Sequence, residues 1–227
     1  FVECMNHAQA LGMRVVVDLV ANHTSIDHPW FQSARSDPKS PYRDWYVWAD
    51  KRPRDHAKGT VFPPMQKTTW TRDKKAGKYY FHRFYDHQAD LNTHHPAYRE
   101  ELYKIMGYWL QLGVSGFRMD AVPFLVERKG ANVKPVKDFG LLQEMRRFLQ
   151  WRARDAIMLA EANVLPGESM HYFGDEGDRL QMMLNFPVNQ RLYYAFATQD
   201  PGPLRQAIRD TLAHIPRDAQ WVQFLRS

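Results

Sequence analysis

The stretch Gly116-Phe117-Arg118-Met119-Asp120 determines how the rest of the chain is interpreted. It opens an apolar segment, Gly116–Val122, that predicts a buried strand with charged side chains toward its C-terminal end. Side chains alternate along a strand, so Arg118 and Asp120 are expected to point the same way. A neighbouring arginine favours the ionised form of a carboxylate, which is the form that a nucleophile needs. A purely structural arginine–aspartate pair is the alternative interpretation.

Two other apolar segments end in the same manner. Arg14–Val20 contains Asp18 and is followed by Asn22 and His23, and the segment 156–162 contains Glu161. Partial burial at a strand end favours the protonated carboxyl group that a general acid must carry, although Glu161 could instead cap the following helix. Carboxylates offered by two strands are the pair that glycosidases use. His23 could be a base, a metal ligand, a hydrogen-bond donor to substrate or a structural residue.

Strands and helices alternate along the second half of the chain. Helices are expected at 2–10, 96–112, 139–154, 168–173 and 203–215, and further strands at 181–186 and 221–226. This alternation predicts an α/β fold with a parallel sheet and helical crossovers. In a (β/α)8 barrel the active site lies at the C-terminal ends of the strands, where the charged residues fall here.

Residues 24–95 differ from the rest of the chain. They are rich in Pro, Asp, Lys, Tyr and Trp and show no sustained helical period, so we expect a loop-rich insertion with a short sheet near 78–85. Most of its aromatic side chains are expected to pack that subdomain's own core, and a few to stack on a sugar.

Composition excludes several functions. The chain has 227 residues and a formal net charge of +6, but its basic residues are dispersed among acidic ones, which argues against a nucleic-acid partner. No apolar run is long enough to cross a membrane. Cys4 is the only cysteine, which favours a reducing compartment and a cytoplasmic location. Phe1 stands where a methionine would, so the natural N-terminus is expected to lie upstream.

Taken together, the motifs resemble those of the α-amylase family, glycoside hydrolase family 13. The resemblance covers the whole chain and rests on Asp18–His23, Gln88–Asn92, Gly116–Asp120 and Glu161. It implies a partial TIM (β/α)8 barrel, about strands three to seven, built from residues 1–23 and 96–227. Residues 24–95 would be domain B, inserted after the third strand.

The resemblance also implies roles for individual residues. Asp120 would be the nucleophile and Glu161 the general acid/base. His23 and Arg118 would contact the sugar or order the nucleophile, with Asp18 holding Arg118. The segments Phe81–Tyr85 and Gln88–Asn92 are similar to those of the oligo-1,6-glucosidase and trehalose synthase group.

The reaction implied is therefore retaining α-glucosyl transfer on α-linked gluco-oligosaccharides or disaccharides. Hydrolysis and maltose–trehalose interconversion both remain open, and the oligomeric state is not predicted. A catalytically silent relative that serves as a carbohydrate-binding or accessory protein is the alternative, although the presence of Asp120 and Glu161 argues against it.

Members of this group often hold a structural calcium ion between domain B and the barrel. The matching positions are the side chains of Asn22, Asp90 and Glu127 and the backbone carbonyls of Phe124 and Leu125. All are oxygen donors, as a hard cation requires. The alternative is that Asn22 and Asp90 simply form hydrogen bonds that tie domain B to the barrel.

One departure from the family pattern concerns the end of the chain. The family continues its Phe-Leu-Arg motif with Asn-His-Asp, whereas here Phe224-Leu225-Arg226 is followed by Ser227. The third catalytic carboxylate, the first two barrel strands and the last one are therefore expected outside this chain. We expect the complete protein to be active and the 227-residue piece alone to be inactive.

Overall fold

The computed structural model describes residues 1–134, 136–213 and 215–225. It divides into two compact units. The first unit comprises Phe1–Leu19, Tyr103–Pro123 and Phe139–Ser227, and the second comprises Val20–Leu102 and Phe124–Asp138. The expected insertion, 24–95, falls entirely within the second unit.

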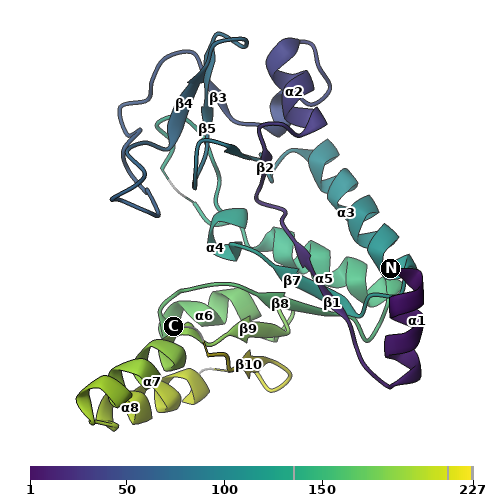
Figure 1. Cartoon of the computed structure of the whole chain (residues 1–227), viewed down its shortest axis with the longest axis vertical. Helices are drawn as coiled ribbons and strands as arrows, with labels where there is room; N and C mark the ends of the chain where they lie inside the picture. The colour runs from purple at the N-terminus through teal and green to yellow at the C-terminus, as the bar shows by residue number, and fades with distance from the viewer. Residues whose placement is uncertain (135, 214, 226–227) are drawn as a thin grey trace. The chain divides into compact units, whose positions relative to one another are not determined.

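A parallel sheet forms the centre of the first unit, as Figure 1 shows. Its strands, in spatial order, are β1 (Val16–Leu19), β7 (Gly116–Met119), β8 (Ile157–Ala160), β9 (Met182–Leu184) and β10 (Gln220–Val222). Every neighbouring pair is parallel. The spatial order follows the chain order, as in a barrel, and this confirms the predicted α/β class and partial barrel.

Helix α1 (Val2–Ala10) precedes the first strand of this sheet. The helices that separate its later strands include α5 (Gly140–Arg152), α6 (Pro166–Phe173), α7 (Phe186–Thr198) and α8 (Gly202–Ala213). Two more, α3 (Pro96–Gln111) and α4 (Val122–Leu125), contain residues of both units. In the described part of the chain no helix is both long enough and apolar enough to cross a membrane.

Sequence analysis did not predict α7. The expected strand 181–186 ends earlier, at Leu184, and the Asn185 side chain accepts a hydrogen bond from the Val188 amide at 3.2 Å. Asparagine at this cap, followed by Pro187 in the first turn, is a common helix start. Because apolar residues extend from the strand to Phe186, the sequence pattern did not reveal where the helix begins.

Close packing of β7 on β8 depends on Gly116. A Cβ atom at this position would lie 2.4 Å from the carbonyl oxygen of Ile157. The sheet beyond it is filled by fully buried side chains, among them Phe117, Met119 and Met158. Gly116 is therefore required because β8 lies too close to β7 at this point to leave room for a Cβ atom.

Among its described residues, the second unit contains two small antiparallel sheets. In one, β2 (His23–Ser25) pairs with β6 (Gln88–Asp90); in the other, β5 (Lys78–Phe81) lies between β3 (Trp48–Ala49) and β4 (Trp70–Asp73). The β5 strand falls at the expected position. The second unit also contains α2 (Pro29–Ser36), which sequence analysis did not predict, and the 3-10 helix η1 (Arg43–Trp45).

Aromatic side chains form much of the second unit's interior. The fully buried ring of Phe31 on α2 lies 5.0 Å from that of Tyr46, 5.1 Å from that of Tyr80 and 5.6 Å from that of Trp48. Such pairs add specific geometry to the burial of large apolar surface. These aromatic residues therefore pack the subdomain, as expected for most of them.

The structure also assigns to the second unit three segments that sequence analysis placed with the barrel. They are 20–23, which includes His23, 96–102, at the start of α3, and Phe124–Asp138, which comes after β7 in the chain. Backbone hydrogen bonds from Arg128 to Val136 and from Asp138 to Val126 fold the latter segment on itself. The domain boundaries themselves stay a prediction.

Candidate active site

The charged residues of the predicted site lie at the C-terminal ends of three neighbouring strands of the first unit. Asp18 on β1 is in register with Arg118 on β7. Asp120 directly follows β7, and Glu161 directly follows β8. Backbone hydrogen bonds from Asp120 to Leu19 and from Glu161 to Met119 continue the sheet to both residues. The scaffold thus fixes the backbone of each carboxylate.

Arg118 connects two of these carboxylates. Its Nη1 atom donates to Asp18 Oδ1 at 2.9 Å, and its Nη2 atom donates to Glu161 Oε2. The exposed fraction is 34% for the arginine side chain, 61% for Asp18 and 27% for Glu161. The guanidinium of Arg118 therefore holds Glu161 with one nitrogen and Asp18 with the other, and solvent partly screens both ion pairs.

The pKa of Arg118 reports on the charges around it. Burial lowers this pKa, but the hydrogen bond to Asp18 and the charges of Glu161, Asp18 and Asp120 outweigh that effect and raise it above its ordinary value. Asp120 therefore contributes to the same electrostatic cluster. A guanidinium among three carboxylates keeps its charge at any pH relevant to the protein.

An unusual backbone conformation follows Asp120. Ala121 has a φ of 52°, in the left-handed region that residues with a Cβ atom adopt at a cost. It lies between the end of β7 and the start of α4, and it is buried. The Val122 amide then donates to the carbonyl oxygen of Glu161 at 3.2 Å. Strain of this kind is concentrated at functional sites.

His23 belongs to the second unit and is nearly buried there. Its Nδ1 atom lies 3.3 Å from Asn22 Nδ2, and its Nε2 atom lies 3.2 Å from Gln88 Nε2. The ring of Phe84 packs edge-on at 5.3 Å. Both amides come from motifs that sequence analysis selected, so the structure groups His23 with Asn22 and Gln88.

The predicted calcium ligands all lie in the second unit, and each has a protein partner. Asn22 Nδ2 donates to Asp90 Oδ2 at 3.2 Å. Glu127 Oε2 pairs with Arg83 Nη2 at 2.7 Å. The Leu125 carbonyl accepts from Thr93 Oγ1 at 2.9 Å, and the Phe124 carbonyl accepts from the Glu127 amide at 3.3 Å. The calcium ion stays a prediction.

Sequence analysis missed Lys129, which lies among these same oxygen atoms. Its Nζ atom is 2.9 Å from Asp90 Oδ2 and 2.7 Å from Asn22 Oδ1, and the lysine side chain is only 1% exposed. Burial lowers the pKa of Lys129, and the charge and hydrogen bond of Asp90 oppose that effect. No local pattern signals such a contact, because the partners are far apart in the sequence.

Comparison with known proteins identifies the family. The family model described as the α-amylase catalytic domain matches residues 1–223. The chain belongs to the α-amylase family. A trehalose synthase from Thermus thermophilus is 42% identical to this α-amylase-family chain over 225 residues, which are 98% of the chain and 23% of that protein.

Other relatives are similar to this α-amylase-family chain over different lengths. A trehalose synthase/amylase from Mycobacterium tuberculosis is 39% identical over 231 residues, covering 100% of the chain and 38% of that protein. An oligo-1,6-glucosidase from Halalkalibacterium halodurans is 39% identical over 123 residues, covering 52% of the chain and 21% of that protein. The chain thus spans well under half the length of these relatives.

Solved structures share the fold of this α-amylase-family chain. The trehalulose synthase MutB from Pseudomonas mesoacidophila MX-45 superposes with a TM-score of 0.78 at 27% identity, covering 100% of this chain and 44% of that one. The α-amylase from H. orenii gives a TM-score of 0.83 at 23% identity, over 100% of this chain and 44% of that one. The latter likeness supports the fold alone.

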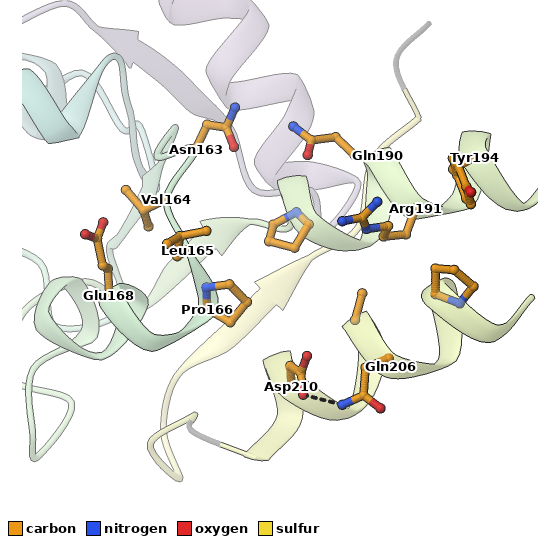
Figure 2. A pocket seen from close by; sticks show the side chains of 13 residues that line it. Asn163, Val164, Leu165, Pro166, Glu168, Gln190, Arg191, Tyr194, Gln206 and Asp210 are labelled. Carbon is orange, nitrogen blue, oxygen red and sulfur yellow. Dashed lines mark hydrogen bonds between the residues drawn. The ribbon is translucent and has the colours of Figure 1, made fainter.

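A cavity of about 710 Å³ in the first unit of this α-amylase-family chain was not predicted. Figure 2 shows the segment from Asn163 to Pro166, which follows Glu161, on one side, and residues of α7 and α8 on the other. Gln206 Nε2 donates to Asp210 Oδ1 at 2.7 Å along α8. The side chains that line the cavity include amide, guanidinium and carboxylate groups.

Proposed function

We propose that the protein is a retaining enzyme that transfers α-glucosyl groups from α-linked gluco-oligosaccharides or disaccharides. One observation carries the proposal: the Arg118 guanidinium bridges Asp18 and Glu161 at the ends of adjacent parallel strands, with Asp120 one step beyond. Two carboxylates on neighbouring strand ends are what a double displacement at an anomeric carbon needs. Membership of the α-amylase family supports the same reaction class.

In this proposal Asp120 is the nucleophile and Glu161 is the general acid and base. Glu161 donates its proton to the glycosidic oxygen as the bond between that oxygen and C1 breaks. An oxygen of Asp120 attacks C1 and forms a covalent glucosyl–enzyme ester. Glu161 then removes a proton from the acceptor hydroxyl, which attacks C1 and releases Asp120. Two inversions at C1 give net retention.

The acceptor decides between hydrolysis and isomerisation. Water as acceptor yields glucose, whereas the released glucose, bound again through its anomeric hydroxyl, converts maltose to trehalose. Relatives named trehalose synthase match essentially the whole chain, and an oligo-1,6-glucosidase matches about half of it. We therefore propose maltose and trehalose as the substrates, with hydrolysis as a side reaction that depends on how well the site excludes water.

The test uses the full-length protein with maltose, and glucose and trehalose are counted separately. Asp120→Asn and Glu161→Gln are compared with Asp155→Asn, a control at a side chain that is 79% exposed. Both site variants should lose turnover, and the control should retain it. The 227-residue chain alone should show no turnover in the same assay.

An activated substrate separates the two roles. The leaving group of 4-nitrophenyl α-glucoside departs without a proton, so Glu161→Gln should still release a burst of nitrophenol and Asp120→Asn should release none. Turnover of maltose by Asp120→Asn would exclude this residue as nucleophile. An inactive wild-type protein that still binds maltose would favour an accessory, carbohydrate-binding role.

A further inference from the structure

The Lys129 ammonium group lies in a cage of oxygen atoms inside the second unit. Its Nζ atom is 2.7 Å from Asn22 Oδ1, 2.9 Å from Asp90 Oδ2, 3.0 Å from the Leu91 carbonyl and 3.3 Å from the Asn22 carbonyl. Asp90 is fully buried, and so is Asn22. Such an oxygen-rich environment suits a cation, and the Lys129 ammonium group is the cation that occupies it.

The predicted calcium ligands do not fit an additional divalent ion. Asn22 Oδ1 and Asp90 Oδ2 contact Lys129, and Asp90 Oδ1 accepts the Arg83 amide at 2.7 Å. Glu127 is paired with the Arg83 guanidinium, which also donates to the Gly59 carbonyl at 3.0 Å. In the part of the chain that the structure describes, no group of three or more His, Cys, Asp or Glu side chains is placed to hold a metal.

We infer that Lys129 is the structural cation of the second unit and takes the place that calcium would occupy in this fold. Its three N–H donors join the β6 strand, the segment at Asn22 that enters β2, and the segment 124–138. A calcium ion and this ammonium group exclude each other, because both need Asn22 Oδ1 and Asp90 Oδ2. The inference does not rest on the proposed function.

The same contacts extend to His23. Because Lys129 bonds Asn22 Oδ1, the amide nitrogen of Asn22 is left facing Asp90 Oδ2 at 3.2 Å and His23 Nδ1 at 3.3 Å. Lys129 therefore fixes which way the Asn22 amide points. That makes Lys129 a positioning residue for the ring of His23, acting through Asn22.

Burial makes the ammonium hard to replace. A buried charge is tolerated only when it is paired and its hydrogen bonds are made, and removing one partner leaves the other uncompensated. With Lys129 absent, the carboxylate of Asp90 would remain fully buried beside Asn22. The vacated cage would then present side-chain and carbonyl oxygens of the kind that calcium binds.

The experiment measures calcium and thermal stability in the full-length protein. Wild-type protein is dialysed against EDTA, analysed for calcium by mass spectrometry, and melted with EDTA or with millimolar CaCl2. Lys129→Met, which keeps the chain length and removes the charge, is compared with Lys75→Met, a control at an exposed lysine in the same unit. NMR of the His23 ring reports its environment in each variant.

We expect no bound calcium in the wild type and no change of its melting temperature with EDTA or CaCl2. Lys129→Met should melt well below Lys75→Met, recover partly in CaCl2, and shift the His23 ring signals. Stoichiometric calcium in the wild type, or a lower melting temperature after EDTA, would overturn the inference even if Lys129→Met fails to fold. A Lys129→Met protein as stable as Lys75→Met would overturn it as well.

Discussion

Replacing Arg118 with lysine should impair catalysis while leaving the fold intact. The guanidinium reaches Asp18 with one nitrogen and Glu161 with the other. A lysine ammonium is a single point on a flexible stem and cannot reproduce this divided contact. We expect the lysine to keep its bond to one carboxylate and to release the other, so that Glu161 loses its fixed position relative to the leaving group.

The magnitude follows from the bond that is lost. A hydrogen bond between charged groups contributes about 1.5–3 kcal/mol, and each 1.4 kcal/mol corresponds to a tenfold change in rate. If that contact acts in the transition state, kcat should fall about 10- to 150-fold. Stability should change little, because the pair that is lost is partly open to solvent, with Arg118 34% and Glu161 27% exposed, and a solvent-screened ion pair contributes about 0–1 kcal/mol.

The assay is the steady-state kinetics of the full-length protein on maltose, together with thermal melting. Arg14→Lys is the matched control, because Arg14 also pairs with an aspartate of the first unit, Asp155, but at side chains 62% and 79% exposed. Arg118→Lys should lower kcat with KM nearly unchanged, and Arg14→Lys should change neither. An Arg118→Lys enzyme with wild-type kcat, or one altered only in KM, would refute the positioning argument.

Two further predictions concern stability. Ala121→Gly should leave the melting temperature unchanged or raise it by the equivalent of up to about 1 kcal/mol, because glycine relieves the positive φ at a cost in unfolded-state entropy. Ala121→Val should lower the melting temperature. The reverse order of the two variants in thermal melting would contradict this prediction. Burial lowers the pKa of His82, whose Nδ1 donates to the Phe84 carbonyl at 3.0 Å, so the unfolded chain takes up a proton first as the pH falls through about 6.5. The stability that this histidine contributes should therefore be complete above that pH and decline below it. In urea titrations, His82→Gln should flatten the dependence of the unfolding free energy on pH. An unchanged dependence would contradict the role given to His82.

Local patterns explain how much of the fold the sequence could predict. The strands β1, β7 and β8 were found because each is a short apolar run ended by charged residues, and that ending also located Asp18, Asp120 and Glu161. By contrast, α7 was missed because its start is joined to the preceding apolar strand, and α2 because its eight residues give too short a pattern in an aromatic-rich segment. A period needs several turns to become visible.

Contacts between distant residues set a different limit. Lys129 bonds an asparagine 107 positions earlier and a carbonyl 38 positions earlier, and neither separation leaves a trace in the local pattern. That the oxygen donors Asn22, Asp90 and Glu127 converge was implied by the resemblance to the α-amylase family, and not by any local pattern. Oxygen donors alone do not specify their cation, since an ammonium group and a calcium ion both require them. Whether an ammonium group or a calcium ion fills the cage depends on whether a lysine side chain can reach it. Only the folded structure shows that Lys129 does.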